Sequence, residues 1–463
     1  MPTTPAVVLG AGIAGLLAAA VLARHPQVGE VTVVERDRLE PGPQPRRGLP
    51  QGQHAHVLMS SGARIIETLL PGTTDRWLAA GAHRIGLPDG YVMLLPAGWL
   101  PRWSSDHFVI SCSRGLLDWV VRQQVLALPG VRLVDRTEAT GLRGGRGRVT
   151  GVRVEDLDHG TGRTLEAGFV VDATGRGSRA PHWLRSLGAP PVVEDVVDSG
   201  LRYATRVFRA PAGAAHRFPI VNVQADPGQD RPGQTAALMP VEDGRWLVTL
   251  SGTRGGRPSA DEREFVGFAR GMRHPVVADL IADADPLGPV TVSNSTANRR
   301  RRFERLPGWP DGFVVLGDAV ASYNPVYGHG MSVAAHGAAA LGAALDGHGL
   351  RSGLARTVQR RIVATAAAAW DHATGTDVRF PGARGRPPGR AERALWRYQT
   401  RLMRTALDRP EVARQLVDVL TLSAPANRLV RPGIALATLL GPRRPAPDGP
   451  TFTAAERAML SET

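Results

Sequence analysis

Short apolar runs separated by glycine-rich turns mark the start of the chain. Residues 6–9 are apolar and lead into a turn that holds three glycines. An alanine- and leucine-rich run follows over residues 16–24, and residues 31–34 form a second short apolar run. Short apolar runs bounded by turn residues are typical of buried strands, and the longer run between them is typical of a helix. The pattern predicts a strand, helix and strand in that order.

The next part of the chain alternates between helical and extended patterns. A helical run is expected over residues 57–70, and residues 77–110 have the mixed pattern of strands and turns. A helix is expected to begin near residues 111–122, where a serine is available as N-cap. Three further apolar runs predict strands, at residues 131–134, 149–154 and 169–171.

The second half of the chain first predicts a sheet and then helices. Apolar and polar residues alternate over residues 201–208 and 245–250, which predicts an antiparallel sheet inserted into the first domain. An apolar run returns at residues 313–316 and is followed by an alanine-rich helix that reaches residue 345. From residue 354 onward the pattern is mostly helical, with basic loops at residues 384–390 and 443–447.

The three glycines of the first turn have the spacing that dinucleotide binding needs. Gly10 permits the tight turn, Gly12 leaves room for a pyrophosphate, and Gly15 lets the helix approach the strand. Glu35 follows Gly15 by 20 residues and can accept hydrogen bonds from ribose hydroxyls, which indicates FAD or NAD. A coincidental glycine turn is disfavoured because a strand precedes the turn, a helix follows it and an acid stands at the expected distance. A signal peptide or membrane helix over residues 5–23 is disfavoured because the N-terminal end lacks basic residues and the glycines have dinucleotide spacing.

Composition restricts the range of functions. The 463 residues carry a net charge of +14, but all 56 basic residues are arginine, which favours a coding bias over a selected nucleic-acid surface. The densest run, residues 299–302, is expected to form a structural or solvated arginine face, so no nucleic-acid partner is expected. Cys112 is the one cysteine, which excludes a disulfide framework and suits a cytoplasmic location. No transmembrane segment is expected.

Two other groups of polar residues are candidates for binding a metal or a cofactor. His54 and His56 lie in a loop without a third ligand nearby, so hydrogen bonds within the loop are favoured over a metal site. Arg114 stands near a predicted helix start, where it can reach a pyrophosphate or a ribityl chain, pair with Asp118, or do both.

Three segments in order resemble the class A flavoprotein monooxygenases, which share the para-hydroxybenzoate hydroxylase fold. They are the glycine triplet, the turn Asp172-Ala173-Thr174-Gly175 and the pair Gly317-Asp318. Four further stretches resemble the squalene-epoxidase-like olefin epoxidases of actinobacterial polyether-ionophore pathways: residues 46–56, 174–179, 324–331 and 369–377. The flavin halogenase signature Trp-x-Trp-x-Ile-Pro is absent.

This resemblance implies an FAD site and no metal. The residues expected to bind FAD are Gly10, Gly12, Ile13, Ala14, Gly15, Glu35 and Arg36 at the ADP half, Arg114 and Asp318 at the phosphates and ribityl chain, and Pro325, Gly328, Gly330 and Met331 at the flavin ring. It also implies dioxygen as co-substrate and NAD(P)H, or reduced flavin from a partner reductase, as the electron source. A flavin hydroperoxide is expected to carry the chemistry, so no side chain is predicted as catalytic.

The resemblance predicts an epoxidase acting on alkenes of a linear, polyether-type polyketide or terpenoid-like substrate, which can be carrier-bound. Two other functions stay open: that of an aromatic or polyketide hydroxylase, and that of a flavin-dependent isoprenoid reductase that does not activate oxygen. The expected fold is α/β (mixed α+β), with a Rossmann-like FAD-binding domain, an inserted antiparallel substrate sheet and a C-terminal helical region. The FAD-binding parts are residues 1–75, 111–185 and 296–350, the sheet parts are residues 76–110 and 186–295, and the helical region is residues 351–463.

Overall fold

A five-stranded parallel sheet organises the half of the molecule that contains the N-terminus. The computed structural model describes residues 3–460 except residues 47 and 295. The strands, in sheet order, are β20 (Phe313–Val315), β12 (Phe169–Asp172), β1 (Thr4–Leu9), β2 (Val28–Val34) and β8 (Val131–Val134). Val7 pairs with Thr32 on one side and with Val170 on the other. The strands predicted for residues 6–9, 31–34, 131–134 and 169–171 are therefore confirmed.

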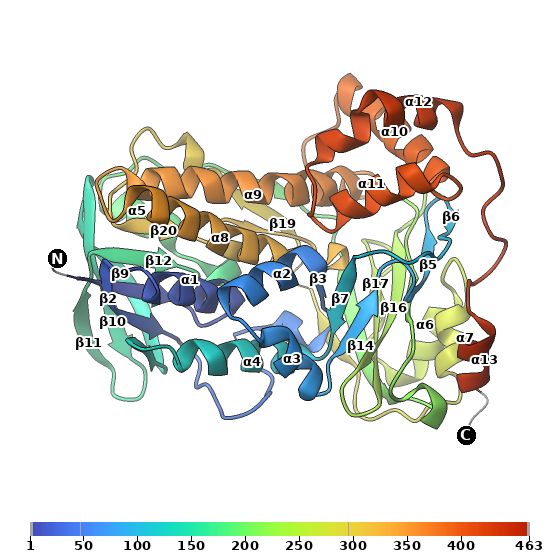
Figure 1. Ribbon diagram of the computed structural model, residues 1–463, viewed down its shortest axis with the longest axis horizontal. Helices are drawn as coiled ribbons and strands as arrows, with labels where there is room; N and C mark the ends of the chain where they lie inside the picture. The colour runs from blue at the N-terminus through green and yellow to red at the C-terminus, as the bar shows by residue number, and fades with distance from the viewer. Residues whose placement is uncertain (1–2, 47, 295, 461–463) are drawn as a thin grey trace.

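Helices pack beside this sheet, and a small antiparallel sheet lies against it. Figure 1 shows the alanine-rich helices stacked in layers beside the parallel strands. The helices are α1 (Ile13–Ala23), α4 (Arg114–Leu126), α5 (Ala180–Ser186), α8 (Gly330–His348) and α9 (Leu354–Asp377). The small sheet contains β9 (Thr137–Gly145), β10 (Arg148–Asp156) and β11 (Thr161–Glu166), and β10 packs against β12. Small residues on α1 and α8 allow these two helices to pack closely.

A second, seven-stranded sheet lies at the carboxyl side of the parallel strands. Its order is β18 (Thr291–Ser293), β14 (Arg202–Arg209), β17 (Arg245–Gly252), β16 (Gln234–Val241), β15 (Ile220–Val223), β5 (Tyr91–Leu95) and β6 (Gly98–Trp99). The predicted antiparallel pairing is confirmed except between β15 and β5, which run parallel. Helices α6 (Phe265–Arg270) and α7 (Val276–Ile281) pack with this sheet around a second hydrophobic core.

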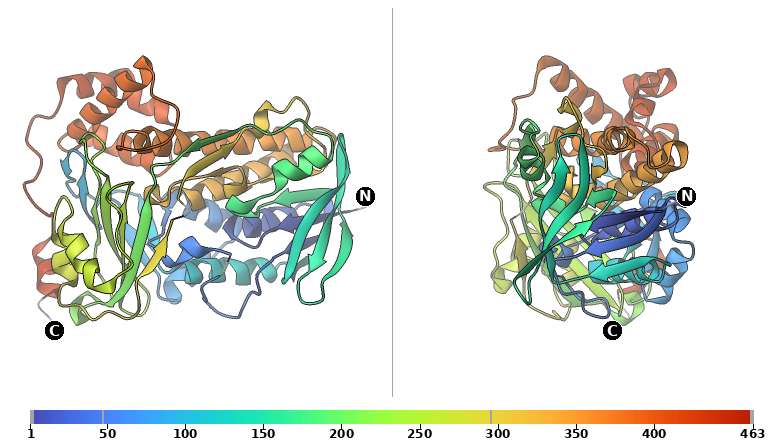
Figure 2. Two further views of the ribbon diagram at one scale, coloured as in Figure 1. Left: turned by 180° about the vertical axis from the view of Figure 1, so that it is seen from behind. Right: turned by 90° about the vertical axis from the view of Figure 1, so that its left-hand side faces the viewer.

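The C-terminal helices cover one end of the second sheet. They are α10 (Arg390–Ala406), α11 (Pro410–Leu420), the short turn η8 (Ala426–Val430) and α12 (Pro432–Leu440). Figure 1 shows this group above β5 and β6, while α13 (Ala454–Met459) returns to the side of α6 and α7. The left view of Figure 2 places the first strand, β1, and the last helix, α13, toward opposite ends of the molecule. No helix among residues 3–460, apart from the two undescribed positions, has the length and hydropathy to cross a membrane.

Two local predictions were wrong. Residues 57–59 form strand β3 (Val57–Met59), and the helix α2 (Ser60–Leu69) begins only after it. Trp77, expected among strands and turns, lies in helix α3 (Thr73–Ala79). A distant partner decides the first case, because β3 pairs with β7 (Phe108–Ser111). Part of the arginine run, residues 299–302, lies in strand β19 (Asn298–Arg301), which pairs with β13 (Glu194–Val197). The α/β fold class itself is confirmed.

The contact between β1 and α1 gives a direct test of the glycine spacing. A Cβ on Gly15 would lie 1.8 Å from the carbonyl oxygen of Gly10, whereas a Cβ on Gly12 would have no atom within 4 Å. We expect Gly15→Ala to lower the free energy of unfolding by about 1–3 kcal/mol, because the backbone must move to admit the methyl group. Gly12→Ala is the matched control, and without FAD it should unfold at the same urea concentration as the FAD-free wild type. Equal midpoints for both variants would contradict this packing.

Candidate functional site

A cavity of about 1300 Å³ runs from the edge of the parallel sheet to the C-terminal helices. Its walls come from the glycine turn of β1, from the end of β2, from residues 318–331, from one face of the seven-stranded sheet and from α9, α10, α11 and η8. All but one of the predicted FAD-binding residues line it: Gly10, Gly12, Ile13, Ala14, Glu35, Arg36, Arg114, Asp318, Pro325, Gly328, Gly330 and Met331. Gly15 does not line the cavity, and its role is the helix packing described above.

The end of the cavity next to β1 has the shape of a nucleotide cradle. Gly10 has a φ of +92°, and a Cβ there would lie 2.6 Å from the carbonyl oxygen of Ala173. Gly12 is the N-cap of α1, so the first free amides of this helix face the open space beside it. These backbone groups fit a pyrophosphate, which needs amide donors and close approach.

Glu35 stands at the end of β2 beside this cradle. Its Oε2 accepts from the Ala11 amide at 2.7 Å and pairs with Arg46 at 2.5 Å, while its Oε1 accepts from the Asp37 amide at 3.0 Å. Oε1 therefore keeps capacity for a ribose hydroxyl. Arg46 also donates to the carbonyl of Ala11 at 2.8 Å and lines the cavity. Arg47, its neighbour in the sequence motif, lies outside the described residues.

The dinucleotide motif of three glycines and an acid gives no reason to expect an arginine beside Glu35. Arg46 belongs to a loop whose path the sequence pattern does not predict, so its ion pair is visible only in three dimensions. The predicted pair of Arg114 and Asp118 is confirmed, with Nε and Oδ1 at 2.7 Å. Ser113 is the N-cap of that helix, as expected, and accepts from the Leu116 amide.

Asp318 faces the middle of the cavity. Burial raises the pKa of its carboxyl group, and the charges of Arg176, Arg114 and Arg301 oppose that shift. Among the described residues no hydrogen bond to its side chain is present, so its oxygens stay available for the hydroxyls of a bound chain. Arg176 donates to the carbonyls of Ala297 and Tyr323, which holds its guanidinium at the same place.

A buried carboxylate, Asp377, fixes the turn that follows Asp318. The turn is η7 (Pro325–Tyr327), with Asn324 as N-cap and Gly328 in the left-handed region at a φ of +68°. Asp377 is 1 % exposed and accepts from Asn324 at 2.9 Å and from the Tyr327 hydroxyl at 2.7 Å. Asn298 and Ser199 also donate to it, at 2.7 and 3.2 Å. Burial raises its pKa, and these hydrogen bonds oppose the shift.

Histidines border the same turn. The Nε2 of His329 donates to the carbonyl of Leu420 at 3.0 Å, and its buried Nδ1 has no partner among the described residues. Burial lowers the pKa of His329 to about 4 and that of His372, its ring neighbour, to about 3. His56 bonds to the carbonyl of His54, as predicted for the loop, but His54 reaches Thr205 of β14 instead.

The far part of the cavity is mostly apolar. The seven-stranded sheet contributes one wall and the C-terminal helices contribute the opposite one. Large apolar side chains on these walls are Tyr91, Met93, Leu100, Trp103, Ile220, Met239, Trp396, Leu402, Met403, Leu416 and Val417. Trp99 and Phe108, aromatic residues of neighbouring strands, pack in the hydrophobic cores instead.

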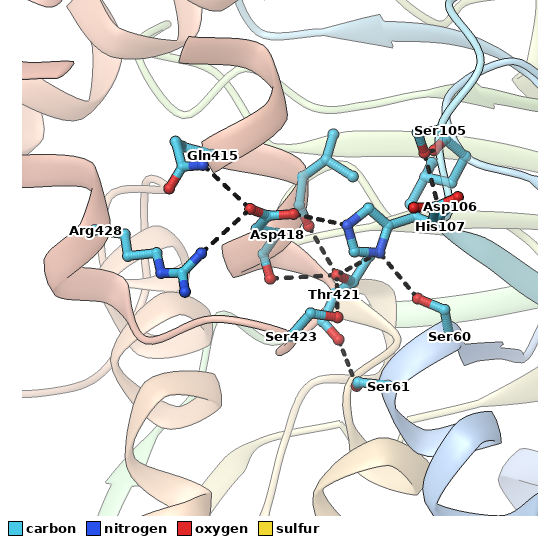
Figure 3. Close-up of polar contacts among 12 residues, drawn as sticks. Ser60, Ser61, Ser105, Asp106, His107, Gln415, Asp418, Thr421, Ser423 and Arg428 are labelled. Atoms are coloured by element: carbon cyan, nitrogen blue, oxygen red, sulfur yellow. Dashed lines mark hydrogen bonds and ion pairs between the residues drawn. The ribbon is translucent and has the colours of Figure 1, made fainter. Parts of the chain in front are cut away.

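A polar cluster fastens α11 to the rest of the molecule (Figure 3). His107 bonds through Nε2 to Asp418 at 2.8 Å and through Nδ1 to Ser60 at 3.1 Å. Ser61 donates to the carbonyl of Thr421 at 2.5 Å. The set of Ser60, His107 and Asp418 has the residue types of a hydrolase triad, but Ser60 is fully buried and does not line the cavity. The cluster therefore positions the helix that forms the cavity wall.

Comparison with known proteins agrees with this geometry. The chain is 34% identical over 401 residues to Protein Rv3254 of Mycobacterium tuberculosis, which covers 83% of this chain and 82% of that protein. The chain belongs to the same family as Protein Rv3254. It is also 29% identical to a kynurenine 3-monooxygenase of Salinispora arenicola, over 74% of this chain and 72% of that enzyme. No family model matches the chain.

Among solved structures, p-nitrophenol 4-monooxygenase PnpA from Pseudomonas putida has the same fold. It superimposes with a TM-score of 0.64 at 17% identity, over 91% of this chain and 99% of that protein. The chain thus has the fold of the FAD-dependent monooxygenases, and its sequence relatives support a flavin-dependent monooxygenase.

The free carboxylate of Asp318 leads to a first prediction for the site. Losing hydrogen bonds to a charged group costs about 1.5–3 kcal/mol, and 1.4 kcal/mol corresponds to about tenfold in affinity. Asp318→Ala should therefore weaken FAD binding more than tenfold in a fluorescence titration. Asp346→Ala, on the exposed side of α8, is the control and should bind FAD like the wild type. Unchanged affinity in Asp318→Ala would place this carboxylate away from the cofactor.

His329 leads to a second prediction, on pH. Its pKa in the folded protein is about 4, below the ordinary 6.5, so the unfolded chain takes up the proton first as the pH falls. Its contribution to stability is complete above pH 6.5 and is lost as the pH falls toward 4; at pH 5 the loss is about 2 kcal/mol. Urea unfolding at pH 7 and pH 5 should show a smaller drop for His329→Gln than for the wild type. His348→Gln, at the exposed end of the same helix, is the control for removal of a histidine. An equal drop in His329→Gln and wild type would contradict the assignment.

Proposed function

We propose that this protein is an FAD-dependent monooxygenase that epoxidises alkenes in an extended, mostly apolar, polyketide-like chain. The observation that supports this most is that the cavity continues beyond the turn at residues 324–328. Pockets for a single small ligand measure about 300–1,000 Å³. The cavity of about 1300 Å³ has room for a cofactor at the glycine turn and for a second, long molecule between sheet and helices.

The residues present fit FAD. The glycine turn and α1 would hold the pyrophosphate, Glu35 the ribose, Asp318 the ribityl chain, and residues 325–331 the ring. The free amides at the start of α8 would face the ring and favour negative charge there. When bound and reduced, FAD activates dioxygen and supplies one oxygen atom to the substrate, with NAD(P)H or a partner reductase as the electron source.

The chain's own residues position the reactants and exclude water. Asp377 holds the turn at residues 324–328 through hydrogen bonds from two separate side chains of that turn. The apolar walls remove water from the space beside it, which strengthens each remaining polar contact. The Nδ1 of His329, an acceptor at neutral pH, is one buried polar atom of the cavity lining that has no protein partner among the described residues.

Two histidines of the cavity, His56 and His372, are poor bases for a phenolic proton. Hydroxylation of a phenol calls for a base that takes the phenolic proton, and a base works best with a pKa near the working pH. Burial lowers the pKa of His56 and of His372 to about 3, so neither holds such a proton near neutrality. An alkene needs no proton transfer from the protein before it accepts oxygen.

Labelled dioxygen tests the proposed reaction. The FAD-loaded protein is supplied with reductant and ¹⁸O₂ and is given, in parallel, a linear polyene with trisubstituted alkenes and a phenol. We expect one labelled oxygen for each alkene that reacts, with dioxygen consumed in equal amount. Label found in the phenol and never in the polyene would establish the hydroxylase. A saturated product formed without oxygen consumption would establish the reductase.

A wall residue provides the matched variants. Met93 of β5 lines the apolar part of the cavity. Met93→Trp should lower oxygenation of the long polyene more than tenfold while the protein keeps its flavin absorbance, because the larger ring narrows the space for the chain. Met93→Leu preserves the volume and should stay within about threefold of the wild type.

A further inference from the structure

The four most exposed large hydrophobic side chains among the described residues lie close together in the C-terminal helical region. They are Val430 of η8 and Leu436, Leu439 and Leu440 of α12, with exposed fractions of 57, 59, 64 and 64 %. We call them the leucine patch. Monomeric proteins seldom leave several large aliphatic side chains exposed together, and such patches mark sites of interaction.

The helix that carries the patch is two-sided. Leu436, Leu439 and Leu440 have the i, i+3, i+4 spacing that places side chains on one helical face. Ala437 and Thr438 are buried on the opposite face, and α12 packs against α10 and α11 there. Figure 1 shows α12 at the outer border of the helical region, away from the parallel sheet. The patch therefore faces outward while the helix is held to the protein.

Positive charge surrounds the patch. Residues 351–463 carry 19 arginines against 9 acidic residues, and the stretch 419–447 has no acidic residue. Arg431 directly precedes α12, and Arg443 and Arg444 follow it; all three are exposed. Their side chains have no ion pair with another described residue, although the backbone amides of Arg443 and Arg444 bind Asp408. Arg428, also near, pairs with Asp418 at 3.7 Å.

The patch is continuous with the cavity. Val430 belongs to the patch and also lines the cavity, together with its neighbour Leu429. Leu395 of α10 is 48 % exposed and lines the cavity as well, beside Trp396. The hydroxyl of Tyr398 donates to the carbonyl of Leu429 at 2.5 Å and so joins α10 to η8 at this place. Apolar side chains thus lead from the outer surface to the inner walls, and Arg428, the charged residue of η8, does not line the cavity.

We propose that the leucine patch and its arginines dock this protein on the surface of an anionic lipid bilayer. Leucines with cationic residues at both ends of a helix suit the boundary between acyl chains and headgroups. Arginine binds lipid phosphates, and anionic lipids attract clustered basic residues. Acyl chains can bury the leucines while headgroup phosphates pair with the arginines, which favours a bilayer over a partner that offers acidic groups alone. Docking opens the end of the cavity beside Val430 toward the bilayer, where apolar substrates dissolve. The docking does not depend on the reaction proposed above.

Vesicle sedimentation of the full-length, FAD-loaded protein tests this docking without turnover. The vesicles contain phosphatidylcholine alone or an equal mixture of phosphatidylcholine and phosphatidylglycerol. The protein should sediment with the mixed vesicles at least tenfold more strongly than with the neutral ones, and the difference should shrink as salt is raised. The variant Leu436→Asn, Leu439→Asn, Leu440→Asn should lose at least tenfold in partitioning and keep its flavin absorbance. Arg431→Gln, Arg443→Gln, Arg444→Gln should remove the preference for anionic vesicles.

The chain supplies a matched control. Val193, Val196 and Leu287 are exposed hydrophobic residues outside the C-terminal region, and their triple replacement by Asn should leave vesicle binding unchanged. No binding of the wild type to the mixed vesicles, or undiminished binding of the leucine variant, would overturn the proposal. If the wild type instead forms a dimer that the leucine variant abolishes, and neither binds vesicles, the patch is an interface between two copies and the proposal is wrong.

Discussion

The buried carboxylate of Asp377 connects three parts of the structure that meet at the site. It lies at the end of the long helix α9, while its donors come from the turn at residues 324–328, from β19 and from the segment that precedes β14. A carboxylate that is 1 % exposed is stable only when its lone pairs are satisfied, because burial without hydrogen bonds is costly. Each donor therefore holds the others in place, and the orientation of the turn at residues 324–328 depends on the helix and on the second sheet together.

The nucleotide end of the site could be predicted from sequence because its constraints are local. Gly10 is required by its positive φ and Gly15 by its contact with Gly10, and both constraints arise within one unit of strand, turn and helix. Glu35 has a fixed distance from that turn for the same reason. The ion pair of Glu35 with Arg46 was missed because the intervening loop has no periodic pattern, so its path is decided by packing.

The substrate end of the site was less predictable because its parts are distant in sequence. Strand β5 pairs in parallel with β15 across more than a hundred residues, and no local signal distinguishes this pair from its antiparallel neighbours. Val57 begins a strand because β7 provides a partner, although its own segment has a helical pattern. Asp377 entered the sequence analysis only as the last residue of the stretch 369–377, which carries a family resemblance. The sequence of an alanine-rich helix does not show that several other elements donate hydrogen bonds to its last residue.

The position of the last helices in the chain has a consequence for how the protein is assembled. The cavity is completed by α10, α11 and η8, which follow every other segment that lines it. Synthesis proceeds from the N-terminus, and domains begin to fold as they emerge. The glycine turn, Asp318 and residues 324–328 are thus all made while the cavity still lacks one wall. The contacts of His107 with α11 and of Ser61 with the residue that follows α11 then close that side. The apolar end of the cavity is therefore the last part of it to form.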